Sequence, residues 1–146
     1  YHNRREKPAL AQPLNARYCG LDELLSRSDF VVVAVDLNPE SKALMGKAQF
    51  EKMQSHAVFV NIARGSVVDE EALVHALQQQ QIFAAGLDVY QKEPLQSSPL
   101  FSLPNVVTLP HIGSATAETR LKMAKLAHKN LVDALEGRTP QYLVNG

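Results

Sequence analysis

The chain has 146 residues, 45% hydrophobic and 21% charged, which suits a globular domain with a buried core. Fifteen acidic and fifteen basic side chains cancel, and this balance favours neither nucleic acid nor an anionic membrane as a partner. The lone Cys19 excludes a disulfide framework and a cysteine-rich metal site, and no apolar run reaches the roughly 18 residues that span a bilayer. We therefore expect a cytoplasmic protein without a metal.

The first third of the chain predicts a loop, a helix and a strand. Residues 1–7, YHNRREK, read as the end of a strand that runs into a loop, and this start without methionine predicts a piece of a longer protein. Residues 20–28 have helical spacing and a candidate cap near Asp22. Residues 30–35, FVVVAV, form a continuous apolar run that predicts a strand buried on both faces.

The middle of the chain repeats this alternation. Residues 47–54 place Phe50 and Met53 on one side of a helix, and residues 57–62, AVFVNI, predict the next buried strand. Residues 69–81 begin with acids, which suit a helix N-terminus, and a third strand follows at residues 82–87. The face of this helix that we expect to be buried carries Leu73, Ala76 and Leu77.

The last third predicts a strand and a long helix. A loop rich in proline leads to a short apolar run at residues 106–109. The helix, about residues 115–136, ends at Gly137 and Pro140. Its apolar stripe consists of Leu121, Ala124, Ala127, Leu131 and Leu135.

Strands that alternate with helices predict an α/β fold with a parallel sheet and right-handed crossovers. We therefore expect a partial Rossmann-type doubly wound sheet. The seven glycines never stand two apart, so no G-x-G-x-x-G pattern is present.

Polar side chains follow every predicted strand, at the edge where open α/β sheets bind ligands. Asp36 follows the first apolar run, and Asn3, Arg4 and Arg5 follow the N-terminal segment. The later runs are followed by Asn61 and Arg64, by Asp88 and Glu93, and by His111.

Three of these side chains suit the reduction of a 2-keto acid. Free histidine is mostly neutral near pH 7, but a neighbouring carboxylate stabilises the imidazolium, so a pair of Glu93 and His111 would supply an acid. The guanidinium of Arg64 would hold a carboxylate in two parallel hydrogen bonds. The missing part is a hydride donor, and a nicotinamide would lie at this edge of the sheet.

Three motifs, NIARGSVVDEEAL, AAGLDVYQKEP and LPHIGSAT, resemble in order and spacing the signature regions of the D-isomer-specific 2-hydroxyacid dehydrogenases. RSDFVVVAVDLNPESKALMG and NVVTLPHIGSATAETR are similar to the glyoxylate/hydroxypyruvate reductase branch, which includes 2-ketogluconate reductases. The resemblance covers essentially the whole chain. It implies that residues 1–112 are a partial NAD(P)-binding domain whose G-x-G-x-x-G loop and strand we expect upstream of residue 1, and that residues 113–146 are a helix and tail that return toward a substrate domain. It implies reduction of glyoxylate, hydroxypyruvate or 2-ketogluconate to D-2-hydroxy acids with NAD(P)H.

The resemblance also assigns roles to residues. It implies that Arg64 binds the substrate carboxylate and carbonyl oxygen, that Glu93 pairs with His111, and that His111 donates the proton in reduction. It implies further that Asp88 contacts the nicotinamide carboxamide, and that Ile62 and the backbone near Gly113 line the nicotinamide pocket. The sequence departs from the family at Asp36 and Asn38, where Pro and Thr are more common.

The cofactor preference is predicted at the end of the N-terminal segment. NAD enzymes usually carry an acid there for the ribose hydroxyls, whereas an arginine accommodates a 2′-phosphate. The segment reads NRR, with no acid before Glu6, so we expect NADP(H) to be preferred over NAD(H), with Arg4 and Arg5 as the phosphate clamp and Asn3 as a further cofactor-binding residue.

Other functions are consistent with the same motifs. One alternative is a D-3-phosphoglycerate- or D-lactate-type dehydrogenase, and another is a dinucleotide-sensing protein related to transcriptional corepressors. The resemblance implies a homodimer formed through the cofactor domain. We expect the 146 residues alone to be inactive, since the phosphate loop is missing.

Overall fold

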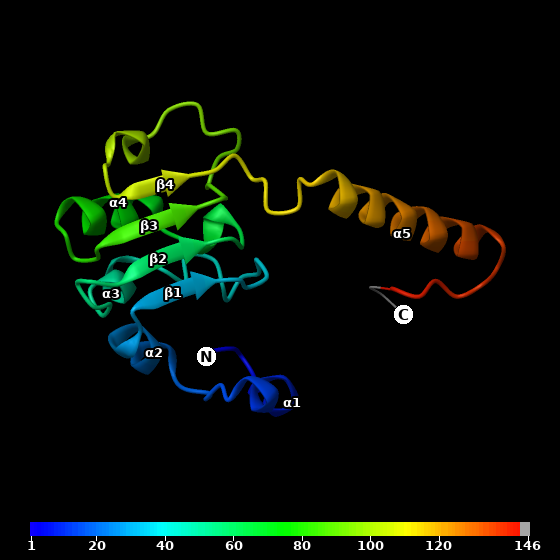
Figure 1. Ribbon diagram of the computed structural model, residues 1–146, viewed down its shortest axis with the longest axis horizontal. Coiled ribbons are helices and arrows are strands. Elements are labelled where there is room, and N and C mark those ends of the chain that lie inside the picture. Colours follow the sequence, from blue (N-terminus) through cyan, green and yellow to red (C-terminus); the bar gives the residue numbers. More distant parts are fainter. Residues whose placement is uncertain (144–146) are drawn as a thin grey trace. The chain divides into compact units, whose positions relative to one another are not determined.

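The computed structural model describes residues 1–143, and the chain divides into two compact units, residues 1–110 and 111–146. The first unit is built on one parallel sheet of four strands in the order β1-β2-β3-β4 (Figure 1). The strands are β1 (Phe30–Val33), β2 (Val58–Asn61), β3 (Ala84–Leu87) and β4 (Val106–Thr108). The predicted α/β class and parallel sheet are confirmed, and each strand lies within its predicted apolar run.

Two helices of the first unit precede β1, and the other two connect β1 to β2 and β2 to β3. Helices α2 (Leu21–Arg27), α3 (Lys47–Phe50) and α4 (Glu70–Gln78) fall within the segments predicted to be helical. The N-terminal segment holds the short helix α1 (Pro8–Ala11) and a 3-10 turn, Gln12–Leu14, which the sequence did not predict. Two further 3-10 turns occupy Gly65–Val67 and Pro99–Ser102.

The core lies between the sheet and these helices. Phe50 of α3 and Phe59 of β2 are fully buried and meet edge to face, with ring centroids 5.2 Å apart. Such aromatic pairs stabilise a core beyond the area that they bury. Leu73, Ala76 and Leu77 of α4 are buried, as the helical spacing predicted.

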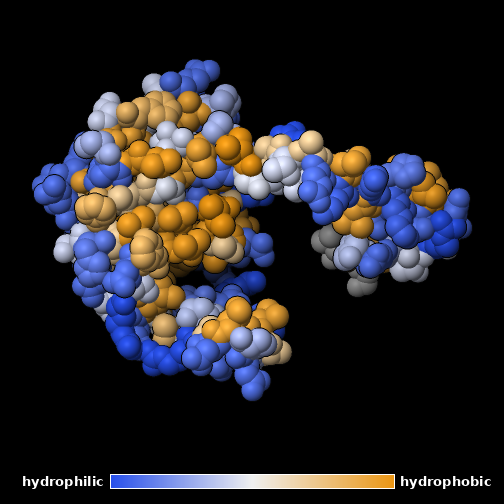
Figure 2. All heavy atoms as spheres, in the orientation of Figure 1, coloured by the Kyte–Doolittle hydropathy of each residue, from blue (hydrophilic) through white to orange (hydrophobic). Residues whose placement is uncertain are grey.

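The prediction that the strands are buried on both faces is wrong for the described chain. Phe30, Val32 and Val107 are 70%, 57% and 64% exposed, while their strand neighbours Val31 and Val33 are buried. In Figure 2 apolar residues gather on this face of the sheet. The reason is that α2, α3 and α4 pack against the opposite face, so alternate side chains have no covering layer.

Two terminal predictions also need correction. Residues 1–7 form no strand; the backbone of Tyr1 instead accepts a hydrogen bond from the N–H of Cys19 at 2.9 Å. Helix α2 is capped by Gly20, in extended conformation and without a side-chain hydrogen bond. Asp22 therefore lies in the first turn rather than at the cap. In this position its negative charge still interacts favourably with the positive end of the helix dipole.

The second unit consists of a turn followed by helix α5 (Ala117–Leu135), which begins two residues later than predicted. The hydroxyl of Thr116 accepts the N–H of Thr119 at 3.2 Å and caps the helix. Gly137, at a φ of 73°, ends it as predicted, because glycine adopts this left-handed conformation without strain. The predicted apolar stripe is exposed along its whole length.

Asp133, near the end of α5, is held by two cations. Its carboxylate accepts hydrogen bonds from Lys129 at 2.5 Å and from Arg138 at 2.8 and 3.0 Å. These bonds keep the pKa of Asp133 below its usual value. The returning chain after Gly137 is thus tied back to the helix.

Candidate cofactor and active site

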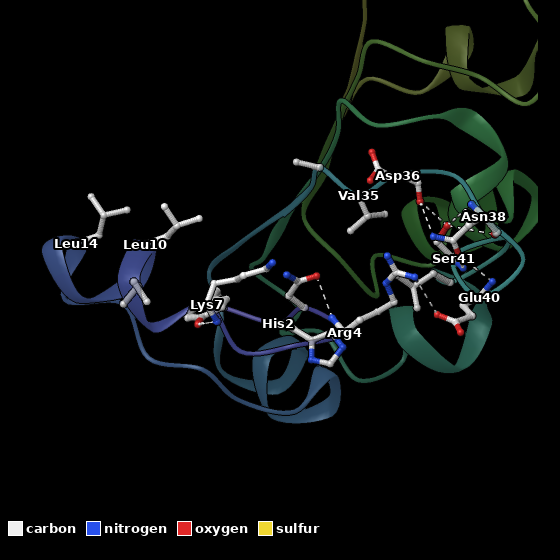
Figure 3. Close-up of a pocket in the computed structure, with 16 residues that line it drawn as sticks. His2, Arg4, Lys7, Leu10, Leu14, Val35, Asp36, Asn38, Glu40 and Ser41 are labelled. Atoms are coloured by element: carbon white, nitrogen blue, oxygen red, sulfur yellow. Dashed lines mark hydrogen bonds and ion pairs between the residues drawn. The ribbon is translucent and has the colours of Figure 1, made fainter. Parts of the chain in front are cut away.

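A cleft of about 550 Å³ lies between the N-terminal segment and the turn that follows β1 (Figure 3). Helix α1 and the turn after it contribute Leu10 and Leu14 to an apolar wall. The other side is polar and is formed by the loop from Asp36 to Ser41. The volume and the mixed lining are typical of a site for a small molecule or cofactor.

The loop after β1 is held by its own polar side chains. The Asn38 Oδ1 accepts the N–H groups of Glu40 and Ser41 at 2.9 and 3.0 Å, which closes an Asx turn. The buried Ser41 hydroxyl donates to the Asp36 carbonyl at 2.6 Å. Asn38, one of the two departures from the family pattern, therefore shapes the wall of the cleft.

Arg4 and Glu40 face each other across this cleft. The Arg4 Nη1 lies 3.5 Å from the Glu40 Oε2, and both side chains are about 70% exposed (Figure 3). Asn3 also lines the cleft, and its Oδ1 accepts the backbone N–H of Arg4 at 2.9 Å. Arg5, the third residue expected there, is exposed and does not line the cleft.

Glu40 was not among the residues that the sequence predicted for the site. The only signal for it is the NPES stretch, in which Asn38 opens a turn that carries Glu40 back toward the N-terminal segment. An acid beside Arg4 partly neutralises the charge that a phosphate would meet.

A second pocket, of about 420 Å³, lies at the carboxyl ends of β1 and β2. It shares Ala34, Val35 and Asp36 with the first cleft, so the two pockets adjoin along one edge of the sheet. Its other wall carries the predicted residues Ile62, which is 55% exposed, and Arg64. This edge therefore combines an apolar wall with two exposed arginines, Arg4 in one pocket and Arg64 in the other, which can hold anionic groups of an extended ligand.

The loop that carries Arg64 is fixed by a buried amide. Asn61, 1% exposed, accepts the N–H of Ala63 at 3.0 Å and donates to the Arg64 carbonyl at 3.2 Å. The Arg64 guanidinium is exposed and donates to the Ala63 carbonyl at 2.6 Å. The backbone is thus held rigidly while the guanidinium stays accessible to an anion.

The chain after β3 carries Asp88 and Glu93. Asp88 is buried, and its N–H donates to the Asn61 carbonyl at 3.1 Å, which continues the pairing of the strands beyond their ends. The Glu93 Oε1 accepts the N–H of Tyr90 at 2.9 Å. This loop also packs closely on the loop of Arg64, since a Cβ at Gly65 would lie 1.8 Å from the Tyr90 carbonyl carbon.

His111 opens the second unit. It is exposed and has a φ of 54°, a left-handed conformation that is strained for a residue other than glycine. Ile112 accepts the N–H of Ala115 in the turn that contains Gly113 and leads to α5. The pairing of Glu93 with His111 stays a prediction.

Metal-binding clusters and membrane-spanning helices are both absent from residues 1–143. No group of three or more His, Cys, Asp or Glu side chains among these residues is arranged to hold a metal ion. No helix in this part of the chain has the length and apolar character needed to cross a membrane.

Residues 1–113 match the family model of the D-isomer specific 2-hydroxyacid dehydrogenase NAD-binding domain. Glyoxylate/hydroxypyruvate reductase B of Klebsiella pneumoniae subsp. pneumoniae is 56% identical over 146 residues, which are 99% of this chain and 45% of that protein. The chain therefore spans less than half the length of this relative.

Solved structures agree in fold. A protein from Thermus thermophilus is 44% identical, with a TM-score of 0.90 over 99% of this chain and 45% of that one. NADPH-dependent glyoxylate/hydroxypyruvate reductase from Sinorhizobium meliloti, in complex with NADP and malonate, is 35% identical, with a TM-score of 0.84 over 91% and 41% of the two chains.

Proposed function

The chain belongs to the D-isomer specific 2-hydroxyacid dehydrogenase family through its NAD-binding domain, and from this membership we propose that it is the cofactor-binding part of a reductase of small 2-keto acids. The proposed substrates are glyoxylate and hydroxypyruvate, with 2-ketogluconate as a further candidate. The observation that carries the proposal is the pair of adjoining pockets along the carboxyl edge of the sheet, with Arg4 in one and Arg64 in the other. The similarity to glyoxylate/hydroxypyruvate reductases supports the choice of substrates.

Arg64 is proposed to bind the substrate. Its backbone is fixed by Asn61 while its guanidinium is exposed at the pocket, so it would grip the carboxylate of a keto acid in two parallel hydrogen bonds. Ile62 lies in the same pocket and would press against the nicotinamide, and Asp88 would accept a hydrogen bond from its carboxamide.

His111 and Glu93 are proposed to supply the proton. A bound nicotinamide dinucleotide supplies the hydride to the carbonyl carbon of the substrate. His111 would donate a proton to the carbonyl oxygen, and the Glu93 carboxylate would stabilise the imidazolium before that transfer. The resemblance of PHIG and YQKEP to the family motifs supports these roles, as it does the role of the backbone near Gly113 in the nicotinamide pocket.

NADP(H) is the proposed preferred cofactor, and NAD(H) the second. Asn3 and Arg4 in the cleft support this preference, with Arg5 as a more distant cation. The Sinorhizobium relative, crystallised with NADP, supports it as well. Glu40 beside Arg4 works against it, so we expect a moderate preference rather than an exclusive one.

Two alternative functions use the same motifs, and the same assays distinguish them from the proposed one. A D-3-phosphoglycerate- or D-lactate-type dehydrogenase would use the same trio with a different substrate. A dinucleotide-sensing protein would bind the cofactor without turning over a keto acid. Substrate profiling separates the first alternative, and the absence of turnover with every keto acid would favour the second.

The test uses the full-length protein that carries this chain, assayed with glyoxylate and hydroxypyruvate and with either cofactor. We expect His111→Gln to lower kcat by about 10²- to 10⁴-fold, as for loss of a general acid. Arg64→Lys should mainly raise the KM for the keto acid, since an ammonium cannot replace the planar guanidinium.

His56→Gln is the matched control. His56 pairs with Asp29 at 2.7 Å, at the amino end of the sheet, so its loss should leave turnover unchanged. Full activity of His111→Gln, or loss of activity in His56→Gln alone, would contradict the proposed roles.

The assembly and the compartment are proposed together with this function. We propose a homodimer formed through the cofactor domain, to be tested by light scattering of the full-length protein. The lone Cys19 supports a reducing compartment, the cytoplasm.

A further inference from the structure

The loops that carry Arg64 and Glu93 and the end of β4 all contact one residue, Tyr90. Tyr90 follows β3, lies within the sequence GLDVYQKEP and is 7% exposed. None of the roles proposed above uses its hydroxyl. A buried hydroxyl needs a hydrogen-bond partner, so its partners indicate what the residue does.

The hydroxyl of Tyr90 ties the end of β4 to the end of β3. It lies 2.8 Å from the carbonyl oxygen of Leu109 and 3.1 Å from that of Leu87. The Leu87 carbonyl also accepts the N–H of Leu109 at 2.8 Å, a backbone bond just beyond the end of β4. The phenol therefore closes the sheet at the point where the chain leaves it, two residues before His111.

The backbone of Tyr90 holds the other two loops. Its N–H donates to the Glu93 carboxylate at 2.9 Å, and its carbonyl group packs so closely on Gly65 that no side chain fits between them. The next residue adds a tether to the first loop, because the Gln91 side chain donates to the Val68 carbonyl at 2.7 Å. One residue thus contacts Glu93, the neighbour of Arg64 and the strand that leads to His111.

We propose that Tyr90 is a positioning residue of the reductase, whose hydroxyl fixes the exit of β4 and thereby the start of the segment that carries the proton donor. This inference rests on the proposed function. Burial raises the pKa of Tyr90 above its usual value, so the phenol remains a donor throughout the neutral range. A phenylalanine would keep the packing of the ring and lose only the tether.

The experiment compares wild type, Tyr90→Phe and Tyr142→Phe in the full-length protein. Tyr142 is an exposed tyrosine after α5 that is assigned no role in the proposed site, and it serves as the matched control. In Tyr90→Phe we expect the single-turnover rate of glyoxylate reduction to fall about three- to tenfold, since one positioning hydrogen bond is lost. The KM for glyoxylate should stay unchanged, because the Arg64 loop keeps its own contacts, and the solvent deuterium isotope effect should rise.

A second readout does not depend on turnover. Hydrogen exchange of the Leu109 amide should become faster in Tyr90→Phe, while the Phe59 amide in the sheet interior keeps its rate. If the Leu109 amide exchanges faster in Tyr90→Phe but the wild type reduces no keto acid, the structural tether is supported and the proposed reductase function is contradicted. Unchanged exchange, or unchanged turnover and isotope effect in an active enzyme, would overturn the positioning role of Tyr90.

Discussion

At the scale of single residues, the candidate cofactor cleft contains one exposed pair of opposite charges, Arg4 and Glu40. Arg4 would attract a 2′-phosphate, and Glu40, 3.5 Å from it, competes for the same guanidinium. Both side chains are exposed, so water screens their attraction and either partner exchanges readily with a ligand. If the cleft holds the dinucleotide as proposed, Glu40 would set how strongly it distinguishes NADP(H) from NAD(H).

Removal of the Glu40 charge should sharpen the preference for NADPH. We expect Glu40→Gln to raise the ratio of kcat/KM for NADPH over NADH about two- to fivefold, in line with the small energies of exposed ion pairs. The ratio is measured in the full-length enzyme at low salt. Glu51→Gln is the control, because it breaks a comparable exposed pair with Lys47 outside the cleft. A fall in the ratio for Glu40→Gln would rule out this competition.

At the scale of elements, helix α4 shows how local chemistry supports the sheet. The Asp69 carboxylate accepts hydrogen bonds from the N–H groups of Glu71 and Ala72 at 3.1 and 3.2 Å, which caps the helix. Its negative charge also interacts favourably with the positive end of the helix dipole. The capping Asp69 stands two residues after the Gly65–Val67 turn, close in sequence to the loop that carries Arg64.

Loss of this cap should destabilise the fold without removing any proposed active-site group. We expect Asp69→Ala to lower the free energy of unfolding by about 1 kcal/mol, and Asp69→Asn to cost much less, since asparagine keeps the acceptor. Urea unfolding of the two variants provides the measurement. Equal stability of the alanine and asparagine variants would show that the cap contributes nothing.

At the scale of the whole molecule, stability is unevenly distributed between the two units. The first unit has the core around Phe50 and Phe59, whereas α5 exposes its apolar stripe and relies on its caps and on the Asp133 cluster. Most helical stability comes from the packing of an apolar face, so within its own unit a 19-residue helix with an exposed stripe is marginally stable in water.

Native-state hydrogen exchange of the 146-residue chain should therefore separate the units. We expect the amides of β2 and β3 to exchange only through global unfolding, and those of α5 to exchange through local opening at much lower free energy. Denaturant dependence of the exchange rates is the measurement. If the α5 amides are as protected as those of β2, the helix has a packing partner in solution.

The sequence by itself determined the α/β class, the parallel sheet and the position of each strand, because continuous apolar runs and helical spacing are local signals. It also predicted that Arg64 and Asp88 follow neighbouring strands, since parallel strands end at one edge. The motifs of the PHIG and YQKEP stretches identified the family from residues alone.

Only the tertiary structure decided which polar groups face one another. Glu40 opposes Arg4 and Tyr90 joins the ends of β3 and β4 because turns bring together residues that are 36 and 19 positions apart. The apolar runs likewise could not predict that one face of the sheet is exposed. Burial depends on which layers pack against a strand and not on the strand's own sequence. Local patterns specify elements, whereas contacts between distant residues follow from packing.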